Sequence, residues 1–251
     1  MTTPSSAIEQ LLLTMADDEL VLGHRNAEWT GHSPILEEDI AFSNIAQDEI
    51  GHSLIWYSLY EQITKRTPDA MAFERTSNEF TCCRFVTYPK GDFAYTVIRQ
   101  FLFDIAEEVR LKSLSSGSYA PIKDAAAKIL KEEAYHRLHS QGLVERLGDG
   151  TEESHRRMQA AVDSAFTQAL GMFEKLSIEG ELVRSNVMIS NQELKEQWLK
   201  IVVPVLQAST LSVNLKSNPD NGGRIGKHTE HLEQLINDLQ SVYRLVPDTK
   251  W

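Results

Sequence analysis

The sequence predicts an all-α protein built on a four-helix bundle, with additional helices toward the C-terminus. Apolar residues recur every three or four positions along several long segments, which is the spacing of an amphipathic helix. No segment alternates apolar and polar residues as a half-buried strand does. Clusters of Gly, Pro, Asn and Ser separate the periodic segments and mark their ends. We therefore expect a single helical domain over residues 1–251.

Two helix hairpins make up the predicted bundle, the first over about residues 5–65 and the second over about 92–147. Helices are expected at about 5–28, 33–65, 92–115 and 119–147. Ser33 and Pro34 suit the N-cap and the first turn of the second of these helices. Only the short turn 116–118 separates the last two helices. These two helices must therefore lie antiparallel to each other.

Residues 67–91 form a connector between the hairpins, of the long kind that some four-helix bundles use. Pro68, Pro89 and Gly91 interrupt this connector, and we expect one short helix in it at about 69–75. Beyond the second hairpin the helical spacing returns three times. Further helices are expected at about 151–176, 190–208 and 227–245.

The charge and the cysteine content narrow the possible functions. The chain has 25 Lys and Arg against 36 Asp and Glu, a net charge of −11, which argues against the clustered basic surface of a nucleic-acid-binding protein. No apolar run reaches the roughly 18 residues that a membrane span needs, and the N-terminus lacks the pattern of a signal peptide. The only cysteines are the adjacent Cys82 and Cys83, which we interpret as buried structural thiols. We expect a cytoplasmic protein.

Two Glu-x-x-His motifs are the main functional signal. Glu49 and His52 lie within the second predicted helix, and Glu133 and His136 lie within the fourth. On a helix, residues i and i+3 share a face about 5–6 Å apart, so each carboxylate can converge with its imidazole. Two such motifs, with one Glu from each of the other two helices of a bundle, are the ligand set of a carboxylate-bridged dinuclear metal site.

The first and third helices each offer one of the missing carboxylates. Glu19 lies 30 residues before Glu49 (49 − 19 = 30), which fits the position of the motif in the first hairpin. In the second hairpin, whose turn is shorter, the same reasoning predicts a ligand near position 108, where Glu108 shares a stripe with apolar residues. The predicted ligands are Glu19, Glu49, His52, Glu108, Glu133 and His136, with Asp18, Asp104 and Glu107 as alternatives at neighbouring positions.

This donor set favours iron or manganese, because carboxylates with one imidazole per metal suit these ions and leave positions open for dioxygen. We therefore predict a di-iron centre, or a manganese–iron one. The competing interpretation is that these carboxylates are solvated charges on the outer faces of helices. The duplicated motif makes the metal site the stronger prediction. His228 and His231 have helical spacing but no third ligand, and we expect a helix cap or an interface contact there.

Several stretches, in their order and spacing, resemble the PaaC-type subunit of the bacterial multicomponent phenylacetyl-CoA monooxygenase. The resembling stretches are Leu20–Leu22, Glu28–Trp29, Gly31–His32, Asp92–Ala94, Arg99–Gln100, Tyr135–His136, Glu145–Gly148, Gly222–Gly223, Gly226, His228–Leu232, Pro247 and Trp251. The resemblance spans nearly the whole chain and implies a ferritin-like fold. It also implies a partnership with other subunits, among them a PaaA-type catalytic subunit. That complex epoxidises the ring of phenylacetyl-CoA with dioxygen and electrons from a reductase.

The resemblance also implies where the metal of such a complex lies. In that family the catalytic di-iron site belongs to the PaaA-type subunit, and the PaaC type is a structural partner without a complete ligand set. This chain departs from the pattern, because all six of its predicted ligands are suitable. We therefore expect either a scaffold subunit of the monooxygenase, or a metal-retaining oxygenase or iron-handling protein that acts through its own site. We also expect the chain to form a homodimer or a heterodimer.

Overall fold

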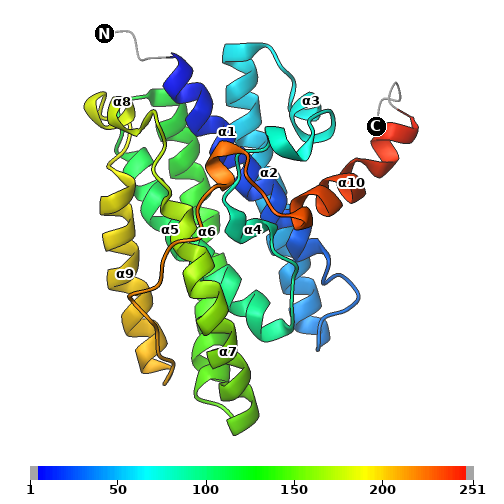
Figure 1. The fold of residues 1–251 in the computed structure, drawn as a ribbon, viewed down its shortest axis with the longest axis vertical. Coiled ribbons are helices and arrows are strands. Elements are labelled where there is room, and N and C mark those ends of the chain that lie inside the picture. The colour runs from blue at the N-terminus through cyan, green and yellow to red at the C-terminus, as the bar shows by residue number, and fades with distance from the viewer. Residues whose placement is uncertain (1–4, 247–251) are drawn as a thin grey trace.

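The computed structural model describes residues 5–246, and within that range the chain is all-α, with helices and no strand. Pro247 and Trp251, which belong to the resemblance, lie outside the described residues. Long helices pack side by side, α7 and α9 cover one side of the bundle, and α10 points away from it (Figure 1). No helix in the described range is long and apolar enough to cross a membrane. The predicted fold class is confirmed.

Helices α1 (Ser5–Ala27) and α2 (Leu36–Thr64) form the first hairpin, close to the expected ranges. α2 begins later than expected, because Ile35 still has an extended backbone with φ −142° and ψ 157°. It ends at Lys65, whose φ of 66° is left-handed and cannot continue the helix.

Gly23 lets α1 and α2 approach each other closely. A Cβ atom at this position would lie only 3.0 Å from the Ala46 carbonyl oxygen and 3.1 Å from Glu49 Cβ. A larger residue would force its neighbours on α2 to shift. Gly23 therefore permits a close contact between α1 and α2 beside Glu49.

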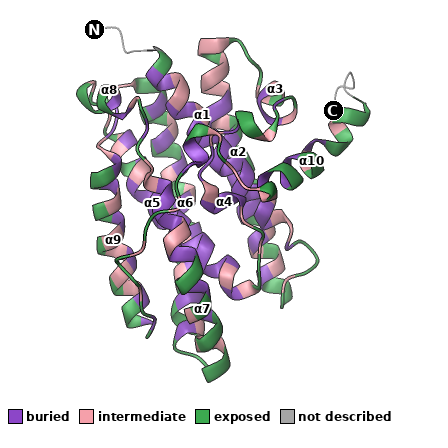
Figure 2. Cartoon of the chain, in the orientation of Figure 1, coloured by how far each residue is buried: buried purple, intermediate pink, exposed green. Residues whose placement is uncertain are grey.

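Helices α5 (Phe93–Ser115) and α6 (Ala120–Gly148) form the second hairpin. Asp92 caps α5 by accepting a hydrogen bond from the Tyr95 backbone N–H at 2.9 Å. α5 is the central helix of the molecule: all residues at 96–109 are buried, because α6, α7 and α9 all pack against it (Figure 2).

The connector holds three short elements instead of the single expected helix: α3 (Pro68–Phe73), η1 (Ser77–Glu79) and α4 (Arg84–Thr87). α4 has no capping side chain at its start, so its sequence carries no capping signal that predicts a helix. Cys82 and Cys83 are buried and free, as the interpretation of them as buried structural thiols requires. Burial raises the pKa of Cys83 to about 12, which keeps the thiol protonated and unreactive.

The C-terminal part contains α7 (Glu152–Ala169), η2 (Leu170–Phe173), α8 (Glu179–Arg184), α9 (Asn191–Ala208), η3 (Gly223–Ile225) and α10 (Glu230–Leu245). α8 was not expected, and η2 shortens the helix expected at 151–176. Ser190 and Glu193 form the predicted capping box of α9. Trp198 of α9 donates its indole N–H to the Leu102 carbonyl at 2.9 Å, which fixes α9 on α5.

Candidate metal centre

Both Glu-x-x-His motifs face the interior of the bundle. Glu49 and His52 on α2 are 0% and 1% exposed, and Glu133 and His136 on α6 are 1% and 3% exposed. The motif side chains are therefore not solvated charges on outer helix faces, which was the competing interpretation.

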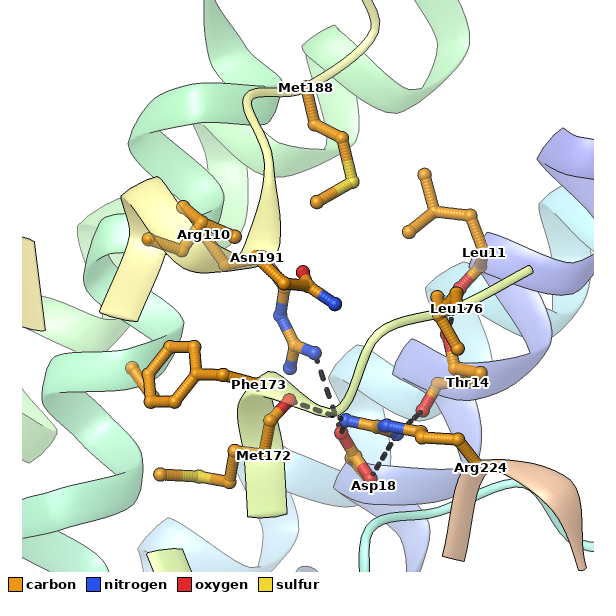
Figure 3. Close-up of a pocket in the computed structure, with 12 residues that line it drawn as sticks. Leu11, Thr14, Asp18, Arg110, Met172, Phe173, Leu176, Met188, Asn191 and Arg224 are labelled. Carbon is orange, nitrogen blue, oxygen red and sulfur yellow. Dashed lines mark hydrogen bonds and ion pairs between the residues drawn. The ribbon is translucent and has the colours of Figure 1, made fainter. Parts of the chain in front are cut away.

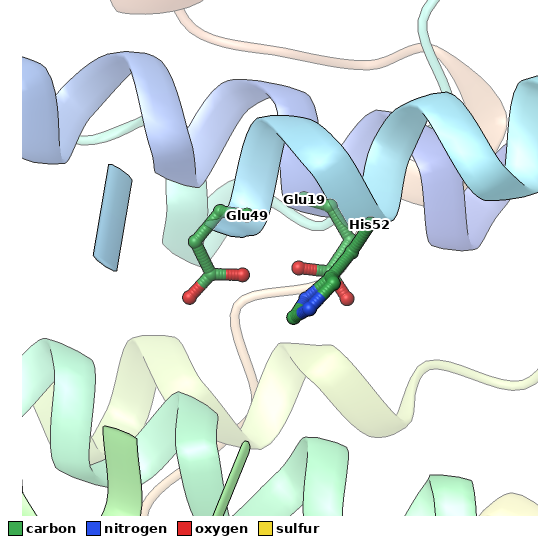
Figure 4. A group of neighbouring side chains, drawn as sticks. All are labelled: Glu19, Glu49 and His52. Atoms are coloured by element: carbon green, nitrogen blue, oxygen red, sulfur yellow. The ribbon is translucent and has the colours of Figure 1, made fainter. Parts of the chain in front are cut away.

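Glu19 of α1 joins the motif of α2. Figure 4 shows the side chains of Glu19, Glu49 and His52 projecting together into the space between the helix layers. One possible donor atom from each residue lies within 4.8 Å of the others, and all three residues are buried. This group has the composition of one half of a dinuclear carboxylate site.

A second group lies beside the first and shares one residue with it. Glu49, Asp104 of α5 and His136 also bring donor atoms within 4.8 Å of one another. Glu133 lies between the two imidazoles, with its Oε1 3.3 Å from His52 Nδ1 and 3.1 Å from His136 Nδ1. Glu49 and Glu133 thus occupy the two positions from which a carboxylate can reach both halves of the site.

Two further acids, which the sequence alone did not reveal, hold the histidines in place. His52 Nε2 lies 2.9 Å from Glu132 Oε2, and His136 Nε2 lies 3.2 Å from Asp48 Oδ2. The contacts cross between the motifs, since the acid that precedes each motif Glu contacts the histidine of the other motif. Because each Nε2 contacts one of these two outer acids, each Nδ1 points toward the central carboxylates. The sequence signal that could have identified these two acids is their position directly before each motif Glu.

Gln100 of α5 orients two of the central carboxylates. Its amide donates to Glu49 Oε1 at 3.0 Å and to Asp104 Oδ1 at 2.6 Å. Asn26 donates in turn to the Gln100 oxygen at 2.7 Å, and the Ser140 hydroxyl donates to Asp104 Oδ2 at 2.5 Å. Asp104 is therefore held from both sides, by its own helix and by α6.

Burial controls the protonation of three of the carboxyl groups. It raises the pKa of Glu19 to about 8, and it raises the pKa values of Glu49 and Asp104 well above their ordinary range, because these groups lack water to stabilise the charge. Burial therefore favours the protonated form of these carboxyl groups when no metal is bound.

Glu133 behaves in the opposite way. Burial alone would raise its pKa, but contacts with His136 and His52 lower the pKa to about 2. Burial alone would lower the pKa of His136, but the neighbouring Glu133 raises it to about 11. Burial alone would also lower the pKa of His52, but the contact with Glu133 raises it. Without metal, the Glu133 carboxylate therefore lies beside a protonated His136.

The donor atoms of the centre fit a pair of metal ions. Oε2 of Glu49 and Oε2 of Glu133 are buried without a hydrogen-bond partner among the described residues, and no N–H or hydroxyl group donates to the Glu19 carboxyl group, which lies beside that of Glu49. Buried polar atoms nearly always have a partner, so this concentration of unpaired atoms fits a ligand from outside the chain. Oxygen donors with one imidazole for each metal suit iron or manganese.

Glu108, one of the predicted ligands, does not join this cluster. It lies one turn further along α5, where its two oxygens pair with Lys112 and Arg137. Asp104, an alternative in the sequence, takes the corresponding place in the second group. Residues four apart share a helix face, so the helical spacing alone could not distinguish the two.

The other two alternatives also have partners. Glu107 pairs with Arg110, and Asp18 accepts hydrogen bonds from Arg224 at 2.7 and 2.8 Å (Figure 3). A cavity of about 30 Å³ lies beside Asp18 and Arg224, which is room for about one water molecule.

Asp17 and Asp18 anchor α1 directly before Glu19. Asp17 accepts hydrogen bonds from Arg75 of the connector at 2.5 and 3.1 Å, while Arg224 comes from η3. The connector and the C-terminal segment together thus fix the rotation of α1 that aims Glu19 at the centre.

The histidine pair near the C-terminus, expected at a helix cap or an interface, makes contacts within the chain instead. His228 Nε2 lies 2.9 Å from the Phe80 carbonyl oxygen, and the His231 ring lies against Tyr88 with 5.9 Å between the ring centroids. Both contacts tie the start of α10 to the connector.

The fold is that of a ferritin-like four-helix bundle, and its buried carboxylate and histidine groups could hold a metal. Residues 2–251 match the family described as "Phenylacetic acid catabolic protein". The chain is 31% identical over 240 residues to the C subunit of 1,2-phenylacetyl-CoA epoxidase from Escherichia coli (strain K12), covering 95% of this chain and 97% of that protein. It is 25% identical over 203 residues to the A subunit from the same organism, covering 79% of this chain and 65% of that protein.

The chain therefore belongs to the phenylacetic acid catabolic protein family, as its sequence motifs suggested.

Proposed function

We propose that this protein is the C-type subunit of a complex that epoxidises phenylacetyl-CoA, and that it pairs there with an A-type catalytic subunit. The similarity to a C-type relative along nearly its full length carries this proposal. The similarity to an A-type relative supports the idea that two related bundles pack together.

The outer face of α2 supports a partner. Leu36, Ile40, Ile50 and Leu54 are 72%, 54%, 43% and 54% exposed, and their spacing places them on one stripe that points away from the core. The stripe covers the 19 residues 36–54, about 27 Å of helix, with the polar Ser43 and Gln47 between its two apolar pairs. Exposed apolar side chains gathered on one face mark interaction sites, and we assign this face to the A-type subunit.

Co-expression with the A-type partner tests the pairing. The wild-type chain is expected to co-purify with that partner in a complex of defined mass, measured by light scattering. Leu54→Asp should weaken the complex, because it places a charge within the apolar stripe. Val242→Asp is the matched control, since Val242 is 56% exposed on the distant α10. The wild-type chain remaining monomeric beside its partner would count against the pairing.

The donor cluster supports a metal centre in this chain as well. Glu19, Glu49, His52, Asp104, Glu133 and His136 would hold the two ions. A bound pair of iron or manganese ions would supply the redox chemistry with which such sites activate dioxygen. Gln100, Glu132 and Asp48 would keep the donors oriented, and the closed bundle would keep bulk water away. An oxygenase that acts through its own site is therefore the second candidate function.

Elemental analysis of protein expressed in iron-supplemented medium tests the centre. We expect about two metal ions per chain, the number that six such donors hold, in the wild type and near none in Glu49→Gln, which removes the carboxylate common to both groups. Glu107→Gln is the matched control, because Glu107 is equally buried on α5 but pairs with Arg110. Wild-type protein without metal would leave the scaffold function standing alone.

A further inference from the structure

We propose that the outer face of α6 is a contact between two copies of this chain, which meet there antiparallel about a two-fold axis at Leu138. The face consists of Lys131, Tyr135, Leu138, Gly142 and Glu145, and we call it the α6 stripe. It is separate from the face of α2 that we assign to the A-type subunit. The inference therefore goes beyond the proposed function and depends neither on the metal centre nor on the A-type subunit.

The α6 stripe points away from the bundle. Its members follow one another at alternate steps of four and three residues, the spacing with which one helix packs against another. Glu133 and His136 of the same helix point into the bundle and are buried, whereas Tyr135 and Leu138 are 74% and 73% exposed. Two large apolar side chains so open to solvent, side by side on one face, mark a contact with another molecule.

The shape of the stripe leaves room for a second helix. A Cβ atom added to Gly142 would meet nothing within 4 Å, so the surface in front of this residue is open. Tyr135 precedes Leu138 by three residues and Gly142 follows it by four. An antiparallel pairing about Leu138 therefore brings the ring of Tyr135 to Gly142 of the second copy, where no side chain opposes it.

A surface groove beside the stripe adds to this room. The groove lies between α5 and α6 and has a volume of about 490 Å³. Ala134, Leu138 and Gly142 belong to its α6 wall. An apolar side chain from a second copy can therefore enter the groove and bury its surface against this wall.

The charges of the stripe select a second copy in the antiparallel orientation. Lys131 and Glu145 lie at the two ends, each seven residues from Leu138, or about 10 Å along the helix. A two-fold axis at Leu138 sets the Lys131 of each copy beside the Glu145 of the other. A parallel pairing would instead place like charges together, which is unfavourable.

The two charged ends are available for such pairs. Within the described residues neither Lys131 nor Glu145 takes part in an ion pair, and Glu145 accepts a hydrogen bond from the Gln141 amide at 2.8 Å. The neighbouring Arg146 is turned toward the first hairpin, where its side chain lies 3.8 Å from Glu38 of α2. The second copy thus supplies the opposite charges that the chain itself does not.

The size of the stripe sets the strength of the contact. It covers the 15 residues 131–145, about 21 Å of helix. One helix face of this length is smaller than the interfaces of permanent dimers. We therefore expect a reversible dimer with a dissociation constant in the micromolar range.

The test is sedimentation velocity of the full chain over a series of micromolar concentrations. The wild type is expected to change from monomer to dimer along the series. Lys131→Glu and Glu145→Lys should each weaken the dimer by about tenfold or more, because each sets like charges together. An equal mixture of the two variants should dimerise about as tightly as the wild type, because each supplies the charge that the other lacks.

Two further variants serve as controls. Lys200→Glu makes the same charge change at an exposed position of α9 and should leave the dimer unchanged. Leu54→Asp, on the α2 face, should also dimerise normally. Failure of this contact and failure of the pairing with the A-type subunit are therefore separate results.

Three outcomes would overturn the inference. A wild-type chain that stays monomeric over the whole series would remove the contact. A mixture of the two charge variants that does not recover would show that Lys131 and Glu145 do not meet across it. Leu138→Asp that dimerises normally, or that loses the complex with the A-type subunit instead, would assign the α6 stripe to something other than a second copy.

Discussion

Two sets of buried carboxylates lie within a few residues of each other in this protein, and they differ in their partners. Asp17 and Asp18 on α1 each accept two hydrogen bonds from a buried arginine. The next residue, Glu19, is equally buried, but no arginine hydrogen-bonds to its oxygens, and the Glu49 carboxyl group lies beside it. The first set is balanced by the chain itself, and the second set is balanced only by protons or by a ligand.

The pKa values follow this difference. Burial alone would raise the pKa of Asp18, but the charges of Arg224 and Arg110 outweigh it and lower the pKa below its ordinary value. The pKa of Glu19 rises to about 8. Adjacent acids on one helix can therefore be a structural anchor and a candidate ligand, and the presence of an arginine distinguishes them.

The largest expected effect on stability is at the paired set. Asp18→Asn would leave Arg224 buried without its counter-charge, and breaking one side of a buried ion pair costs about 3–5 kcal/mol. We expect the free energy of unfolding in urea to fall by about that amount, while Glu19→Gln in metal-free protein leaves it unchanged or higher. A loss below about 1 kcal/mol in Asp18→Asn, the value typical of an exposed pair, would contradict the comparison.

A smaller effect is expected at the acids behind the histidines. Glu132→Gln and Asp48→Asn would keep the fold but loosen the imidazoles that face the centre. Loss of such supporting contacts lowers metal affinity by about 10–100-fold, and a competitive chelator titration measures it. Glu37→Gln, an exposed acid at the start of α2, is the control. Equal affinities in all variants would mean that the crossed contacts do not orient the donors.

Much of this architecture could be predicted from the sequence, because helical spacing and capping residues are local signals. The four bundle helices were found within a few residues of their observed ends, whereas α4 and α8 have no capping signal and were missed. Spacing also identified the faces that carry Glu49 and Glu133. Helical spacing could not choose between Asp104 and Glu108, because the two residues share one face of α5. Only the folded hairpin shows which of the two turns lies beside the other donors.

The partners of Asp17 and Asp18 were beyond any local signal. Arg75 is 58 residues from Asp17, and Arg224 is 206 residues from Asp18. Only the folded connector and the C-terminal segment bring these charges together. The sequence therefore could not tell which acid of the run 17–19 would remain unpaired.

A further expected effect is a difference in how stability depends on pH, and it tests the two sets within one helix. In metal-free protein the pKa of Glu19 rises from 4.5 to about 8 on folding. The protonated side chain is thus favoured in the folded state, and its stabilising contribution is present below about pH 4.5 and is lost as the pH rises through 8. One such group changes the free energy of unfolding by at most about 1.4 kcal/mol per pH unit.

Urea unfolding of chelator-treated wild type and Glu19→Gln between pH 5 and 8 should therefore give curves that converge or cross, because Gln does not titrate. The pKa of Asp18 is lowered on folding, so Asp18 stays ionised over this range and Asp18→Asn should run parallel to the wild type. Parallel curves for Glu19→Gln would mean that Glu19 is already charged in the folded protein, and that the unpaired set resembles the paired one.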